Sequence, residues 1–125
     1  MDILPLLKNL LLLNMISPKV FSPNDPIQHI VCFKFKKHVG GDEIENLKES
    51  FIGLQNKIPG VISITGGQNN SPENLNKGFS HCFIITFENE QARTRYLPHS
   101  EHQNFVSQLK PIMEDVFVID FSFKI

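Results

Sequence analysis

The chain has 125 residues, 41% of them apolar and 20% charged. This length suits one domain, and this composition excludes a disordered chain, a collagen-like repeat and a highly charged tail protein. Twelve basic against thirteen acidic side chains leave a formal charge of −1, so no strong basic field favours nucleic-acid binding. The aromatic residues are eleven Phe, no Trp and one Tyr, which leaves Tyr96 as the only phenol able to do chemistry.

Residues 1–26 differ from the rest of the chain. Residues 1–16 are rich in leucine, and a proline-containing connector follows them. The leucine-rich segment has two interpretations: it is a secretory signal, or it is a short helix that packs on the domain or on a partner. Asp2 and the absence of a small-residue cleavage site argue against the signal. No apolar run reaches the ~18–20 residues of a membrane span. We expect one domain over residues 27–125 and a cytoplasmic location, with export as the alternative if residues 1–16 are a signal.

The first half of the domain predicts a strand, a helix and a second strand. Residues 28–36 alternate in polarity, which is typical of a strand with one buried face. Asp42 is the expected N-cap of a helix whose apolar residues recur every three or four positions as far as Ile58. Residues 61–65 then form a short strand.

The second half also predicts a strand, a helix and a strand. After a loop at 66–78, residues 81–87 read as a strand, and 88–110 read as a helix interrupted at 98–100. Residues 116–123 are the last strand. The order is β-α-β-β-α-β, which predicts an α+β, ferredoxin-like monomer: a four-stranded antiparallel sheet with its helices on one face.

Two of these strands are apolar on both faces. In 81–87 and in 116–121, apolar residues occupy nearly every position rather than every second one. Two helices cover only one face of such a sheet, and a face exposed to water should be polar. We therefore expect a homodimer in which a second copy covers the open face. The alternative is that the leucine-rich N-terminus covers it within the same chain.

The cysteines Cys32 and Cys82 are too few for a disulfide scaffold and lack the spacing of metal ligands. The simplest interpretation is that both are small, buried apolar residues. They share the partner-facing side of neighbouring strands, so they are also candidates for oxidation if the mature protein is exported.

Two histidines begin strands at positions that face the helices. We expect His29 and His81 to lie side by side, because the first and third strands of this topology are neighbours, which we take to be parallel. Two interpretations stay open: both histidines are hydrogen-bonded core residues, or both line the end of a pocket between sheet and helices. Such a pocket would also be lined by Phe33 and Phe83.

The segment from Tyr96 to His102 has the highest density of side chains capable of acid–base chemistry. His99 and His102 are three residues apart and could share one helix face, as two metal ligands would. Zinc catalysis needs three protein ligands, and no spacing in the sequence indicates a third. We therefore expect no metal, and we expect no cofactor. A neutral imidazole can remove a proton while a phenol donates a hydrogen bond to the neighbouring carbonyl, which is an enolising site. The alternative is that Tyr96 and His102 bond each other or the backbone and only fix the kink beside Pro98.

Several segments together resemble the stress-responsive dimeric α+β barrel (Dabb) family. They include HIVCFKFK, CFIITFENEQA, YLPHSEHQNFV and EDVFVIDF, and the resemblance covers about residues 27–123 in one collinear stretch. It implies a ferredoxin-like monomer whose sheet pairs face to face with that of a second copy. The family has proteins without an assigned reaction, a stress protein that assembles into larger rings, and a polyketide cyclase.

The resemblance also assigns roles to individual residues. In the cyclase, the catalytic Tyr and His fall on Tyr96 and His102, and two pocket histidines fall on His29 and His81. His102 would be the general base and Tyr96 the donor to the substrate carbonyl. His99 matches a further family histidine, although the proline that usually follows it is Ser100 here.

Three functions remain open, because a fold does not determine a reaction. We favour a homodimeric stress-response-type barrel that binds a small hydrophobic molecule between sheet and helices. The second is a lyase or cyclase that performs aldol or enolisation chemistry on a polyketide-like carbonyl substrate with Tyr96 and His102. The third is a purely structural, protective assembly.

Overall fold

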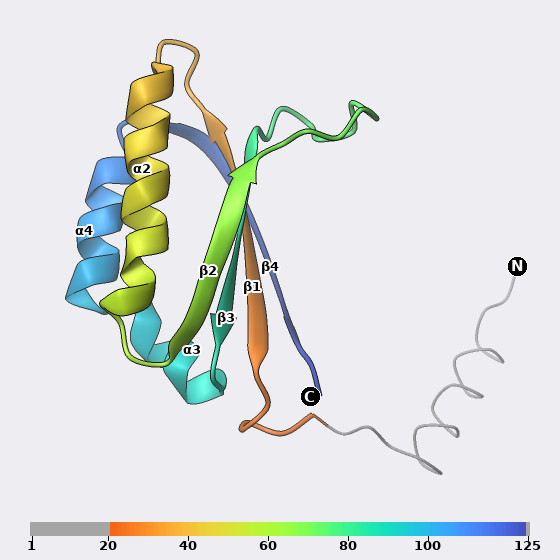
Figure 1. The fold of residues 1–125 in the computed structure, drawn as a ribbon, viewed down its shortest axis with the longest axis vertical. Coiled ribbons are helices and arrows are strands. Elements are labelled where there is room, and N and C mark those ends of the chain that lie inside the picture. Colours follow the sequence, from red (N-terminus) through yellow and green to blue (C-terminus); the bar gives the residue numbers. More distant parts are fainter. Residues whose placement is uncertain (1–20, 125) are drawn as a thin grey trace, which may run out of the picture.

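The computed structural model describes residues 21–124, which form one antiparallel sheet with helices on a single face (Figure 1). The strands are β1 (Ile27–Phe35), β2 (Val61–Gln68), β3 (His81–Phe87) and β4 (Met113–Ser122), in the order β2-β3-β1-β4 across the sheet. The helices are α2 (Gly41–Gly53), α3 (Glu90–Tyr96) and α4 (Ser100–Leu109), and a 3-10 turn, η1 (Leu54–Asn56), follows α2. The predicted ferredoxin-like order is therefore confirmed.

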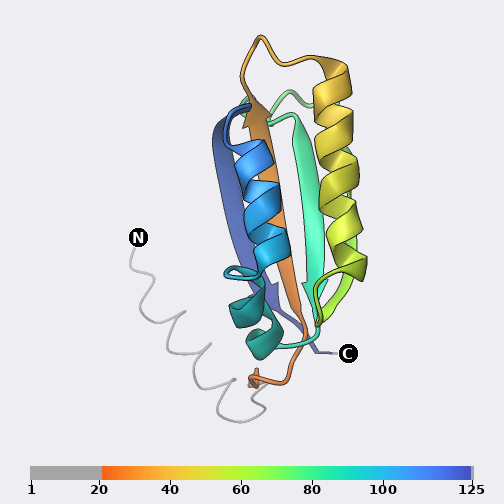
Figure 2. The same ribbon diagram turned by 90° about the vertical axis from the view of Figure 1, so that its left-hand side faces the viewer.

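The core lies between the sheet and helices α2 and α4, which pack side by side across it (Figure 2). Alternation explains its composition, because every second residue of β1 and β3 faces the helices. Phe51 is at its centre, stacked on Phe83 at 4.8 Å between ring centroids and edge-on to Phe105 at 4.5 Å. Such aromatic pairs contribute about 0.5–1.5 kcal/mol each beyond the apolar area they bury.

Two details of the expected fold are wrong. β1 and β3 are antiparallel rather than parallel, so His29 pairs with Ile85 and lies at the opposite end of the sheet from His81. Asp42 does not cap α2: the helix begins at Gly41, its N-cap is Gly40, and no side chain caps it. The predicted interruption of the helix over 88–110 is confirmed: Leu97 still has a helical backbone, but that of His99 is extended, and α4 begins at Ser100.

The turn after η1 depends on Gly60. Its φ of +87° is a left-handed backbone conformation that other residues adopt only with strain. A Cβ atom there would also lie 2.5 Å from the Cβ of Ala92, which is buried in α3. Gly60 thus lets β2 begin directly beneath α3, and this contact sets where Tyr96, at the end of α3, meets the sheet.

No helix of residues 21–124 covers the other face of the sheet. Figure 1 shows the helices on one side only, with the β2–β3 loop projecting on the other. The exposed apolar side chains of this open face include Ile84 on β3 and, on β4, Phe117, Ile119 and Phe121. About half of each of the three β4 side chains is accessible. An apolar patch of this kind on a sheet is typical of an interaction surface.

The predictions for residues 1–20 lie outside the described part of the chain. Within residues 21–124, no helix has the length and apolar character to cross a membrane.

Candidate functional site

A cavity of about 580 Å³ lies between α4 and the strands β1 and β4. In Figure 2, α4 lies over the middle of the sheet, and β4 is the edge strand beside it. The lining divides into a polar end and an apolar remainder. The polar lining residues are His29, Arg93, Tyr96, His102 and Asp120. The aromatic and aliphatic lining includes Phe33, Phe51, Phe105, Val106, Leu109, Val116 and Val118.

Tyr96 is the last residue of α3 and is 1% exposed. Its ring packs edge-on against Phe87, and this burial raises the pKa of the phenol, so the hydroxyl stays protonated at any physiological pH. The hydrogen bonds found within residues 21–124 do not include the Tyr96 hydroxyl. A protonated phenol that has no hydrogen-bond partner among these residues is a donor available to a molecule in the cavity.

His102 lies in the first turn of α4, with its ring centroid 4.4 Å from that of Tyr96. Its Nδ1 is 2.9 Å from the carbonyl oxygen of Leu97, which can only accept, so Nδ1 carries the proton. In the neutral ring the free lone pair is then on Nε2. Burial, the largest effect, lowers the pKa of His102; the bond to Leu97 opposes it, and the neighbouring His29 and His99 each lower the pKa by less than that bond raises it. His102 is therefore a neutral base near pH 7.

His29 is fixed at the same end of the cavity by Asp120. Its Nδ1 donates to one carboxylate oxygen of Asp120 at 2.7 Å, while Arg93 donates to the other oxygen at 3.2 Å. The strand register produces this contact, since His29 on β1 and Asp120 on β4 are directly opposite and both face the helices. The bond fixes the tautomer of His29 and leaves Nε2 free. Its ring centroid is 6.3 Å from that of Tyr96.

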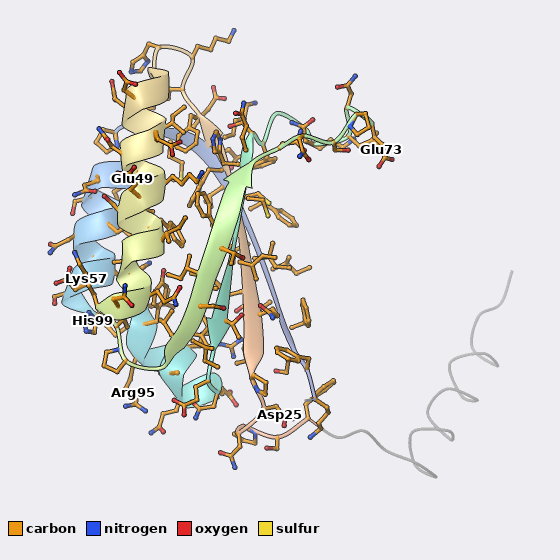
Figure 3. All side chains as sticks on the ribbon, in the orientation of Figure 1. Asp25, Glu49, Lys57, Glu73, Arg95 and His99 are labelled. Carbon is orange, nitrogen blue, oxygen red and sulfur yellow. The ribbon has the colours of Figure 1, made fainter. Side chains whose placement is uncertain are left out.

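The structure places the other predicted site residues elsewhere. Phe33 lines the cavity, but Phe83 is a core residue that does not. His81 is at the far end of the sheet, 9% exposed, hydrogen-bonded through Nδ1 to the Ser80 hydroxyl at 2.8 Å. His99 lies on the outer side of the helices (Figure 3), where its Nδ1 accepts a hydrogen bond from the Glu101 amide and caps α4. Of the five histidines, His29 and His102 are those that line this cavity.

Two polar residues of the cavity, Asp120 and Arg93, were not predicted from the sequence. The sequence does indicate Asp120, because it is the single charged residue in the run VFVIDF and the alternation of the strand puts it on the face toward the helices. A carboxylate on the buried face of an apolar strand needs a partner. Arg93 carried no such signal, because basic residues on a helix are usually solvent-exposed.

No group of three His, Cys, Asp or Glu side chains within residues 21–124 is arranged to hold a metal ion.

The domain model for the stress responsive A/B barrel matches residues 27–123 of the chain. The chain belongs to this family. It is 32% identical over 96 residues to the stress-response A/B barrel domain-containing protein HS1 of Arabidopsis thaliana, a match that covers 77% of this chain and 88% of the relative. It is 23% identical over 96 residues to olivetolic acid cyclase of Cannabis sativa, covering 77% and 95% of the two chains.

Solved structures agree with the family assignment. The crystal structure of Arabidopsis thaliana protein At3g17210 has a TM-score of 0.74 and 31% identity, covering 78% of this chain and 95% of that one. A dimeric protein of unknown function with a ferredoxin-like fold from Bacteroides fragilis has a TM-score of 0.64 and 25% identity, covering 83% and 100%. The proteins that resemble this chain therefore include one named as a cyclase and one described as dimeric.

The free energy of unfolding of this barrel domain is expected to decrease as the pH is lowered from about 7 to about 5. Burial lowers the pKa of both His81 and His102 beneath the ordinary 6.5. Below about pH 6.5 the unfolded chain therefore binds protons that the folded chain does not yet bind, so protonation favours unfolding. Urea titrations at about pH 7, 6 and 5 should show a decreasing free energy of unfolding. His81→Gln should flatten this slope and the exposed His38→Gln should not; equal slopes in all three chains would contradict the assignment.

Proposed function

We propose that this protein binds a small, largely apolar carbonyl compound in the α4–β4 cavity and catalyses proton transfer at the carbon next to the carbonyl. One observation carries the proposal. His102, neutral and with no hydrogen bond to Nε2 among residues 21–124, lies in contact with Tyr96, a protonated phenol that also has no hydrogen-bond partner among these residues. Both lie at the polar end of an otherwise apolar cavity. A base and a hydrogen-bond donor aimed at one space are the requirements for enolisation.

The chemistry assigns one role to each group. The Tyr96 hydroxyl donates a hydrogen bond to the substrate carbonyl oxygen, which becomes the enolate oxygen. His102 Nε2 removes a proton from the adjacent carbon, and the electron pair of that C–H bond moves to the enolate. The enolate carbon can then attack a second carbonyl of the same molecule, forming a C–C bond, while the imidazolium returns its proton to the new alkoxide. His29, fixed by Asp120, can hydrogen-bond a second oxygen through Nε2.

The similarity to a relative named as a cyclase supports this reaction class. The assignment of Tyr96 and His102 as its catalytic pair is the prediction made from the sequence resemblance. The cavity supports a substrate that is mostly apolar: its walls away from the polar end are Phe, Leu and Val side chains. A volume near 580 Å³ falls within the range of sites for small organic molecules.

We also propose that the working form is a homodimer paired through the open face of the sheet. The likeness to a dimeric ferredoxin-like protein supports it. So does the face itself, since Ile84, Phe117, Ile119 and Phe121 would be costly to leave in water.

Two measurements test the function. Native mass spectrometry of the purified protein should detect a retained small molecule, which should disappear after denaturation and refolding. The ligand-free protein should accelerate deuterium uptake at the α-carbon of a β-keto octanoyl thioester, followed by proton NMR in D₂O. If the probe binds but takes up deuterium no faster than it does without protein, the proposed catalysis is wrong and only the proposed binding remains. Failure to bind either a natural ligand or the probe would overturn it.

A further inference from the structure

The α4–β4 cavity is lined by a charged hydrogen-bond donor to which the proposed reaction gives no role. Arg93 lies three residues before Tyr96 on α3, and side chains at this spacing share one face of a helix. Both residues line the cavity at its polar end. Residues at this spacing have Cβ atoms about 5–6 Å apart, so their two donors can reach two atoms of the same small molecule.

Asp120 holds the guanidinium of Arg93 but uses little of its capacity to donate hydrogen bonds. Nη1 of Arg93 donates to Oδ2 of Asp120 at 3.2 Å, while His29 donates to Oδ1 at 2.7 Å. A guanidinium has five N–H groups in a fixed plane, and the hydrogen bonds found within residues 21–124 use one of them. The side chain of Arg93 is 34% accessible, so its other N–H groups are open to a ligand in the cavity.

Arg93 is also the lining residue best suited to bind a second carbonyl oxygen. A carbonyl oxygen only accepts hydrogen bonds, and Asp120 offers only acceptors. The proton on Nδ1 of His29 is bonded to Asp120, and His102 acts through the lone pair of Nε2. Arg93 and Tyr96 carry their protons at any physiological pH. They therefore form a pair of permanent donors in this cavity.

A second carbonyl group on the substrate suits the base in this cavity. Burial lowers the pKa of His102 below its ordinary value, which makes it a weak base. A carbon between two carbonyl groups loses its proton far more readily than a carbon beside one, because both oxygens share the charge of the enolate. Donors placed where this charge develops stabilise the enolate further, so each oxygen needs one.

We propose that Arg93 donates a hydrogen bond to the second oxygen of a β-dicarbonyl substrate, while Tyr96 donates to the first. This inference rests on the function proposed above and adds Arg93 to it as a substrate-binding residue that determines specificity. Nε2 of His102 takes the proton from the carbon between the two carbonyl groups. The electron pair of that C–H bond spreads over the carbon and both oxygens, and Arg93 keeps its own protons throughout.

The test compares two uncharged probes of equal chain length: hexanoylacetone, which is a β-diketone, and methyl heptyl ketone, which has a single carbonyl group. The enolate of the diketone absorbs in the near ultraviolet at longer wavelength than its neutral enol. The chain adds little absorbance there, because it has one Tyr and no Trp. Wild-type protein saturated with the diketone should show the enolate band at a pH where the free diketone shows almost none.

Arg93→Gln should lose most of this enolate band. It should also accelerate deuterium exchange of the diketone by a factor of about 10² to 10³ less than the wild type does, the usual effect of removing one such donor. Its affinity for methyl heptyl ketone, measured by NMR titration, should equal that of the wild type, because this probe has no second oxygen. If Arg93→Gln fails to fold, Arg93→Lys replaces it: lysine keeps the charge beside Asp120 but lacks the planar fork, so the same losses are expected.

Arg95→Gln is the matched control, because it removes the same charge from the same helix. Arg95 is exposed and does not line the cavity, and Figure 3 shows it on the outer side of α3. The enolate band and the exchange rate should both stay at the wild-type level.

The role of Arg93 and the proposed function fail in different ways. A wild-type protein that neither binds the diketone nor accelerates its exchange contradicts both. If the wild type does both and Arg93→Gln keeps the band and the rate, the proposed function stands and the role of Arg93 is wrong. That role is also wrong if Arg95→Gln loses as much as Arg93→Gln. It is equally wrong if Arg93→Gln binds methyl heptyl ketone as poorly as it binds the diketone, because the loss is then structural.

Discussion

His102→Ala is expected to reduce proton transfer in the β-keto thioester exchange assay by a factor of about 10² to 10⁴, the usual contribution of a general base. Nε2 of His102 is the free lone pair beside the Tyr96 hydroxyl, and no other described side chain occupies that position. The melting temperature should change little, because His102 is only half-buried and its single hydrogen bond is to a carbonyl that Gln103 also contacts. The measurement is initial exchange rate against protein concentration, with far-UV circular dichroism of the same samples.

Two further variants make that result interpretable. Tyr96→Phe keeps the buried ring and removes only the hydroxyl, so it should lower the exchange rate while preserving binding of the probe. His38→Ala alters an exposed histidine in a loop and should leave the rate unchanged. A His102→Ala protein that exchanges the probe at the wild-type rate would remove His102 as the base, whereas one that fails to fold would identify it as structural.

Phe121→Asp is expected to convert the protein from a dimer to a monomer. About half of the Phe121 side chain is accessible on the open sheet face, where aspartate would be well hydrated in a single chain. At a dimer interface the same carboxylate would be buried without a partner, which costs about 3 kcal/mol or more and weakens the dimer at least about a hundredfold. Sedimentation at matched concentrations should show the wild-type mass halved.

Leu97→Asp is the matched control for that experiment. Leu97 is exposed to the same extent as Phe121, 53% against 51%, but it lies at the end of α3 on the helical side of the sheet. Its substitution should leave the mass unchanged. A wild-type protein that sediments as a monomer at every concentration would contradict the proposed interface, and so would a Phe121→Asp protein that remains dimeric.

The fold was predictable because each element repeats its own period in the sequence. The apolar residues of α2 recur every three or four positions and those of β1 alternate, so these segments indicate which side is buried. In β3 and β4 the apolar residues occupy both faces, and this predicted a sheet with a second apolar surface. These patterns are local, and each can be read within about ten residues.

The composition of the site was only partly predictable, because contacts across the sheet depend on strand direction and register. His29 and His81 have the same parity, yet the antiparallel pairing of β1 and β3 puts them at opposite ends. The register of β1 with β4 instead places Asp120 beside His29. A shift of two residues would preserve every apolar face while breaking that bond, so periodicity alone could not select it.

The Tyr96–His102 contact illustrates the same division. The sequence supplied a phenol and an imidazole on either side of a proline, and the composition made that phenol unique. The approach of the two rings to 4.4 Å follows from the break between α3 and α4, where His99 caps the second helix with its own side chain. The sequence by itself thus determined the fold class, the open apolar face and the chemical groups available. Only the tertiary structure decided which groups share the α4–β4 cavity, because that depends on packing between segments distant in the chain.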